Sequence, residues 1–151
     1  MKSYDPNTAA KVWDRVRSTP AATADAQAVL ELIAQEMLDA ATYSRLAQRL
    51  PPPQASIARQ IARQEQSHIS CLKGVYTLIT GQKPMVPKPA VTDDPPDIVL
   101  RRCYGREMQC LAQYEKWSDH REYGPVFLRL AQQERAHCAA LLEILGNLKE
   151  R

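Results

Sequence analysis

Glycine and phenylalanine are scarce in this chain, which has five glycines and one phenylalanine in 151 residues. Alternating runs of valine, isoleucine and threonine, the usual pattern of a half-buried strand, are also few. These absences argue against a β-rich fold. Good helix formers (alanine, leucine, glutamine, glutamate and arginine) dominate instead, and they predict one all-α domain with a real core.

Long apolar runs are absent as well. No stretch approaches the ~20 apolar residues that would cross a bilayer, and the first residues lack the apolar core of a signal peptide. We therefore expect a cytoplasmic protein with no membrane partner. The formal net charge of +3 is spread over interleaved acids and bases, so it indicates no nucleic-acid partner either.

CxxC pairs are also missing, which excludes a rubredoxin-type or zinc-ribbon module. The four cysteines lie in predicted helices, and they are Cys71, Cys103, Cys110 and Cys138. This distribution is typical of reduced thiols in a cytosolic protein rather than of a disulfide scaffold.

Prolines and glycines divide the chain into four predicted helices, over residues 20–50, 54–80, 95–120 and 125–146. Residues 82–96 contain five prolines and must form an extended connector. Because this connector can run the length of a bundle, we expect the second and third helices to be parallel neighbours. The prediction is a four-helix bundle with one long crossover.

We assign the bundle to residues 20–151. Residues 1–19 form an N-terminal segment that could contain a short helix. In that segment, Val12 and Trp13 could pack against the bundle or a partner subunit.

Each predicted helix carries a glutamate on its apolar stripe, and two of them also carry a histidine. The stripes are, in chain order, Val29, Leu32, Glu36, Ala40, Tyr43 and Ala47; Ile57, Ile61, Glu65, His68, Leu72 and Val75; Val99, Cys103, Glu107, Cys110, Tyr114 and Trp117; and Phe127, Leu130, Glu134, His137, Leu141 and Ile144. Four glutamates and two histidines are therefore expected inside the bundle.

The two halves of the chain repeat this arrangement. The stripe glutamate and tyrosine of the first helix recur on the third helix, and the Glu-x-x-His pair of the second helix recurs on the fourth. The matching pieces read "EMLDAATY" and "EMQCLAQY", and "ARQEQSHISCL" and "AQQERAHCAAL". A pseudo-twofold axis between the halves would bring the polar core groups of all four helices together.

Buried carboxylates need compensating positive charge, because each ionised group taken out of water costs several kcal/mol. The nearby basic residues Arg59, Arg63, Arg129 and Arg135 fall on other helix faces. Two divalent cations would balance four carboxylates. Oxygen and imidazole ligands without thiolate favour iron or manganese. We therefore predict two Fe or Mn ions per chain, held by Glu36, Glu65, His68, Glu107, Glu134 and His137.

A glutamate with a tyrosine seven residues later, followed by Glu-x-x-His and repeated once, resembles the ferritin-like superfamily. The resemblance covers residues 24–148 and is closest to rubrerythrin-type domains. Bacterioferritins, manganese catalases and several di-iron oxygenases share this ligand set. The length, the short helical hairpins and the long crossover favour the rubrerythrin type.

The resemblance implies a role for each ligand. Glu36 and Glu107 would be terminal carboxylates, Glu65 and Glu134 would bridge the two ions, and each histidine would bind one ion. Tyr43 and Tyr114 match the inward tyrosines of the family. These tyrosines would hydrogen-bond a ligating carboxylate or donate single electrons, or they would simply be core aromatics.

Two features depart from rubrerythrins. Those proteins usually add a rubredoxin domain, and the chain has no CxxC to build one. Many also carry an extra carboxylate on the third helix, where this chain has Cys110. Cys103 and Cys110 could be redox-active, or they could be small buried hydrophobes.

Other charged residues near the ligands have weaker predictions. Asp39 could hydrogen-bond a ligand histidine or face solvent. Arg101, Arg102 and Arg106 are expected on a solvated face.

The resemblance and the ligand set together predict an oxidoreductase that reduces peroxide or dioxygen. Its electrons would come from an external donor protein, and we expect a homodimer. Three alternatives stay open: a ferroxidase or iron-handling protein, a manganese-catalase-like enzyme, and a metal-binding bundle without turnover.

Overall fold

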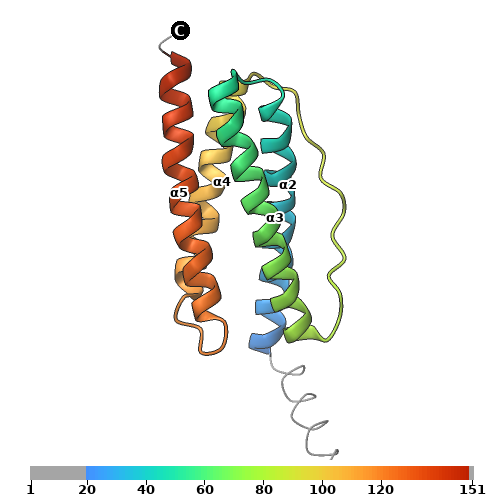
Figure 1. Ribbon diagram of the computed structural model, residues 1–151. Helices are drawn as coiled ribbons and strands as arrows, with labels where there is room; N and C mark the ends of the chain where they lie inside the picture. Colours follow the sequence, from blue (N-terminus) through green and yellow to red (C-terminus); the bar gives the residue numbers. More distant parts are fainter. Residues whose placement is uncertain (1–19, 150–151) are drawn as a thin grey trace, which may run out of the picture.

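The computed structural model describes residues 20–149, and these form an all-α four-helix bundle, as predicted (Figure 1). Its helices are α2 (Pro20–Ala47), α3 (Pro52–Thr80), α4 (Pro96–Trp117) and α5 (Gly124–Lys149). Among the described residues, no helix combines the length and apolar character needed to cross a membrane. The short helix predicted before residue 20, with Val12 and Trp13, lies outside the described residues.

The helix boundaries differ from prediction by a few residues, for local reasons. Helix α3 begins at Pro52, because proline is tolerated in a first turn, where its missing N–H has no helical partner. It ends at Thr80, because the next residue, Gly81, has a left-handed φ of 70° and donates its N–H to the Thr77 carbonyl. Helix α5 runs past Gly146, which has no positive φ and does not end it.

The long connector, residues 81–95, runs along the outside of the bundle from the end of α3 to the start of α4 (Figure 1). Helices α3 and α4 are therefore parallel, as predicted. The prediction that they are neighbours is wrong, since α3 packs on α2 and α5, and α4 packs on α5 and α2. This diagonal arrangement makes every packed pair antiparallel (Figure 1).

Two apolar clusters fill the bundle, one toward each end. The first contains Tyr43, Leu46, Ala58, Leu100 and Leu141, and the second contains Val29, Leu72, Tyr114, Phe127 and Leu130. The predicted stripes are buried, although Ile57 and Trp117 at their ends are partly exposed. Between the clusters lies a layer of buried glutamate and histidine.

Candidate metal centre

All six predicted ligands lie in this buried layer, and each is 1% exposed or less. They come from all four helices: Glu36 from α2, Glu65 and His68 from α3, Glu107 from α4, and Glu134 and His137 from α5. The sequence places them there because glutamate and histidine continue the apolar stripe of each helix.

His68 turns its Nδ1 atom toward three carboxylates. Nδ1 lies 2.9 Å from Glu134 Oε1, 3.1 Å from Glu65 Oε2 and 3.4 Å from Glu36 Oε2. These carboxylates belong to three different helices, so His68 marks a point where α2, α3 and α5 meet.

His137 repeats the arrangement in the second half. Its Nδ1 lies 2.9 Å from Glu65 Oε1, 3.5 Å from Glu134 Oε2 and 3.6 Å from Glu107 Oε2. Glu65 and Glu134 therefore each direct one carboxylate oxygen toward each histidine. This is the arrangement expected of a carboxylate shared between two neighbouring sites.

The other imidazole nitrogen of each histidine is held by a glutamine that the sequence analysis missed. Nε2 of His68 lies 2.7 Å from Gln133 Oε1, and Nε2 of His137 lies 2.7 Å from Gln64 Oε1. Because an amide oxygen only accepts, each Nε2 must carry a proton, which leaves Nδ1 facing the carboxylates and able to bind a proton or a metal ion. The repeat contained the signal, since each glutamine directly precedes the glutamate of a Glu-x-x-His pair.

The atoms that converge here face only one another. Both carboxylate oxygens of Glu65 and Glu134, and Nδ1 of both histidines, are buried and make short contacts within this group but no well-formed hydrogen bond. A buried polar atom left unsatisfied costs on the order of 1–3 kcal/mol, so six such atoms at one point must be satisfied by shared protons or by a metal ion. Oxygen and imidazole nitrogen donors at this density match the ligands of a metal ion.

The donor atoms fall into two overlapping groups, each with its atoms within 4.8 Å of one another. One group is Glu36, Glu65, His68 and Glu134, and the other is Glu65, Glu107, Glu134 and His137. Each group could hold a metal ion, and Glu65 and Glu134 belong to both.

The pKa values divide the four glutamates into two pairs. Burial raises the pKa of Glu65 well above its usual range and that of Glu134 to about 8. Burial alone would also raise the pKa of Glu36 and Glu107, but neighbouring glutamate and histidine side chains lower it instead, for Glu107 to about 2. Without metal, the two shared carboxyls are therefore protonated and the outer two are ionised.

Burial would lower the pKa of both histidines, but the surrounding carboxylates reverse this effect. Contacts with Glu107, Glu134 and Glu65 raise the pKa of His137 to about 12. Those with Glu134, Glu36 and Glu65 raise the pKa of His68 well above its usual range. Two imidazolium groups then balance two carboxylates, so protons neutralise the metal-free cluster.

Each predicted tyrosine hydrogen-bonds a glutamate on the facing helix. Tyr43 donates its hydroxyl hydrogen to Glu107 Oε1, and Tyr114 donates to Glu36 Oε1. Burial raises the pKa of both phenols well above the usual value. Both therefore stay neutral donors, which fixes one oxygen of each outer carboxylate.

Asp39 neither faces solvent nor bonds a histidine, so both alternatives for it are wrong. It is 1% exposed and accepts a hydrogen bond from Arg106 Nε at 2.6 Å and one from Gln35 Nε2 at 3.3 Å. Burial raises the pKa of Asp39 to about 7, against the lowering effect of Arg106. The expectation that Arg106 lies on a solvated face is also wrong, because its side chain is only 20% exposed.

The prediction for Arg106 was wrong because this residue lies at the edge of the buried stripe of α4. At such a position, the orientation of the helix about its axis decides whether the side chain is exposed. Arg106 directly precedes Glu107 and sits at the α2–α4 interface, where Asp39 needs a counter-charge. Arg101 and Arg102 are exposed, as predicted.

All four cysteines are free, as predicted. Burial raises the pKa of Cys103 to about 12 and that of Cys110 further still. Both are therefore thiols at neutral pH, which disfavours a nucleophilic role and favours their interpretation as small buried hydrophobes.

Comparisons of the chain with protein-family models, with curated proteins and with solved structures found no match. The functional assignment therefore depends on the residues of the centre itself.

Proposed function

We propose that the chain binds two iron or manganese ions and reduces peroxide or dioxygen with electrons from an external donor. The observation that carries this proposal is the convergence of six buried polar atoms on Glu65, Glu134, His68 and His137, none of which makes a well-formed hydrogen bond. Four carboxylates and two imidazoles on four helices are the ligand set of di-iron and di-manganese bundles.

The charge balance supports two ions rather than one. Two divalent cations against four ionised glutamates give a neutral centre with two neutral imidazoles, whereas a centre with one ion would have to keep two protons to be neutral. Glu65 and Glu134 would bridge the ions, because their two oxygens face different histidines. Glu36 and Glu107 would complete one shell each.

The bound pair would supply the redox chemistry, since two adjacent ions can together exchange the two electrons needed to cleave an O–O bond. The protein's own groups would hold and orient that pair. Tyr43 and Tyr114 fix the outer carboxylates, Gln64 and Gln133 fix the imidazoles, and the apolar clusters on both sides keep bulk water out. The chain would then be a rubrerythrin-like protein of the ferritin-like superfamily.

Elemental analysis combined with a peroxide assay tests the proposal. The protein, expressed with iron and manganese in excess, should contain about two ions per chain and consume hydrogen peroxide faster when a reductant is added. Glu65→Gln/Glu134→Gln should lose both properties. Glu115→Gln/Glu143→Gln is the matched control, because it makes the same chemical change at two exposed glutamates, on α4 and α5.

The metal content and the oxidant consumed distinguish the proposal from its alternatives. Absence of bound metal in the parent protein would overturn the proposal. Bound metal with consumption of ferrous ion and dioxygen, but none of peroxide, would favour the ferroxidase alternative instead.

A further inference from the structure

One of the two tyrosines at the centre is the inner end of an aromatic cluster, Tyr114, Phe127 and Trp117. The rings of Tyr114 and Phe127 are stacked with centroids 6.2 Å apart, and those of Phe127 and Trp117 are tilted with centroids 5.0 Å apart. Trp117 also follows Tyr114 by three residues on α4, which places the two on one helix face. The cluster is continuous from Glu36, which accepts the Tyr114 hydrogen bond, to Trp117.

The internal repeat relates the metal ligands of the two halves, but it does not extend to this aromatic cluster. When the two halves of the chain are aligned on their ligands, Trp117 corresponds to Leu46, and Phe127 corresponds to Ala58. Leu46 and Ala58 are buried in the cluster that contains Tyr43. Aliphatic residues therefore suffice to pack around a tyrosine here, whereas the single phenylalanine of the chain lies beside the other tyrosine.

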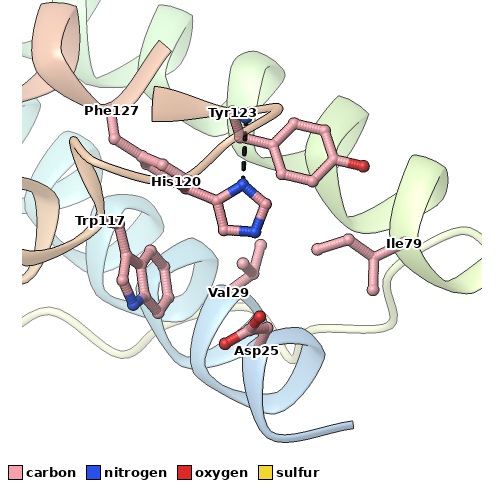
Figure 2. Close-up of a pocket in the computed structure, with 7 residues that line it drawn as sticks. All are labelled: Asp25, Val29, Ile79, Trp117, His120, Tyr123 and Phe127. Atoms are coloured by element: carbon pink, nitrogen blue, oxygen red, sulfur yellow. Dashed lines mark hydrogen bonds between the residues drawn. The ribbon is translucent and has the colours of Figure 1, made fainter. Parts of the chain in front are cut away.

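The outer end of the cluster reaches the surface at one end of the bundle. Trp117 is partly exposed and lines a pocket with Phe127, His120 and Tyr123 (Figure 2). His120 is fixed there, because its Nδ1 accepts the backbone N–H groups of Glu122 and Tyr123 at 3.2 Å and its ring stacks on that of Tyr123. Because Trp117 is partly exposed here, a reductant at this surface would meet its ring directly.

We propose that Trp117, Phe127 and Tyr114 form a path that carries electrons singly from the surface to the metal centre. This inference rests on the proposed function. Close aromatic contact provides the electronic coupling, and the hydrogen bond to Glu36 joins the inner ring to a metal-binding carboxylate. Tyr43 has the same hydrogen bond to Glu107, but among the described residues no stacked or tilted ring pair includes Tyr43.

Reduction of hydrogen peroxide to two waters consumes two electrons and two protons. In each passage Tyr114 would give one electron to the bound metal pair that peroxide has oxidised, and its phenol proton would move along the hydrogen bond to Glu36. Trp117 then gives one electron to Tyr114, which recovers that proton. A one-electron reductant such as ascorbate then returns one electron to the oxidised Trp117, and solvent supplies the protons consumed.

Peptide mass spectrometry of the iron-loaded protein tests the path. After treatment with hydrogen peroxide and no reductant, Trp117 should carry added oxygen, because it loses electrons that nothing replaces. Tyr114→Phe and Phe127→Leu should reduce this oxidation to the level of zinc-loaded protein, whose metal cannot take electrons. Tyr104→Phe is the control, because Tyr104 also lies on α4 but outside the metal centre, and it should leave Trp117 oxidation unchanged. Added ascorbate should protect Trp117 in the parent protein.

Freeze-quench electron paramagnetic resonance gives a second measurement. Trp117→Phe should lengthen the lifetime of a tyrosyl radical. Tyr114→Phe should abolish that radical, and the control Tyr104→Phe should leave it intact. Iron content and melting temperature, measured first, show that each variant is folded and loaded.

The path and the proposed function fail in different ways. A protein that binds no iron overturns both. Iron-loaded protein that consumes peroxide while Trp117 oxidation is the same in Tyr114→Phe as in the parent overturns the path alone. Equal loss of oxidation in Tyr104→Phe and Tyr114→Phe would also overturn it.

Discussion

At the scale of single residues, the two glutamines beside the bridging glutamates connect the halves of the centre. Gln64 from one half holds His137 of the other, and Gln133 holds His68. Each histidine therefore donates a hydrogen bond to a glutamine on a different helix, and this bond orients its Nδ1 toward the carboxylates. The orientation of the imidazole is set before any ion arrives.

Removal of these amides should weaken metal binding without removing a ligand. We expect Gln64→Leu/Gln133→Leu to lower metal affinity by roughly 10–100-fold, because loss of such an outer hydrogen bond frees the imidazole to rotate and to change tautomer. Competition with a chelator of known affinity measures this. Gln66→Leu/Gln132→Leu is the control, since both glutamines are exposed on the same helices. Equal affinity in the two double variants would contradict the assigned role.

Protonation of the metal-free cluster has a consequence for pH. At neutral pH four groups hold protons that a metal ion must displace, namely Glu65, Glu134, His68 and His137. Binding of two divalent ions should therefore release about four protons, and affinity should fall as the pH is lowered. Calorimetric titration in buffers of different ionisation enthalpy counts the protons. Release of fewer than about one would refute this protonation pattern.

The buried pair of Asp39 and Arg106 makes a separate prediction. At a pH of about 8, Arg106→Leu should destabilise the protein by roughly 3–5 kcal/mol, because it leaves the Asp39 carboxylate buried without a counter-charge. The loss should be smaller near pH 6, because Asp39, whose pKa is about 7 beside Arg106 and rises further without it, is protonated there. Urea denaturation of the metal-free protein measures both values.

The double variant Asp39→Leu/Arg106→Leu is the control for this pair. It should be close to the parent in stability, because neither charge remains in the interior. If Arg106→Leu alone costs nothing at either pH, the pair does not stabilise the fold.

At the scale of helices, most of the fold could be predicted because apolar periodicity and proline placement act locally. The stripes identified the buried faces of all four helices, and the prolines before α4 fixed the connector. The ends of the helices were harder to predict, because a glycine ends a helix only when its backbone adopts a left-handed conformation. Gly81 does so, with a φ of 70°, and Gly146 remains inside α5.

These two glycines form a matched pair for mutation. Gly81→Ala should destabilise the protein by roughly 1–2 kcal/mol, because alanine is strained at positive φ. Gly146→Ala should stabilise it by roughly 0.5–1 kcal/mol, because alanine is the better helix former and nothing lies within 4 Å of the added methyl group. Thermal denaturation of both variants is the measurement. Similar effects of the same sign would show that the helix ends elsewhere.

At the scale of the whole molecule, the internal repeat made the ligand set predictable before any coordinates. The repeat could not predict how the α2–α3 hairpin packs against the α4–α5 hairpin. Whether α3 packs on α4 or lies diagonally to it depends on side-chain fit across the bundle, and so does the Asp39–Arg106 contact between hairpins. The glutamine contacts also cross the bundle between α3 and α5, so the apolar stripe of one helix alone gave no sign of them.

The central claim is that one buried layer holds two metal ions that share Glu65 and Glu134. Anomalous diffraction from crystals grown with iron or manganese tests it most directly. We predict two peaks inside the bundle, one bound by Glu36 and His68 and one by Glu107 and His137, with both shared glutamates between them. No peak in this layer, or metal only on the outer surface, would contradict the account.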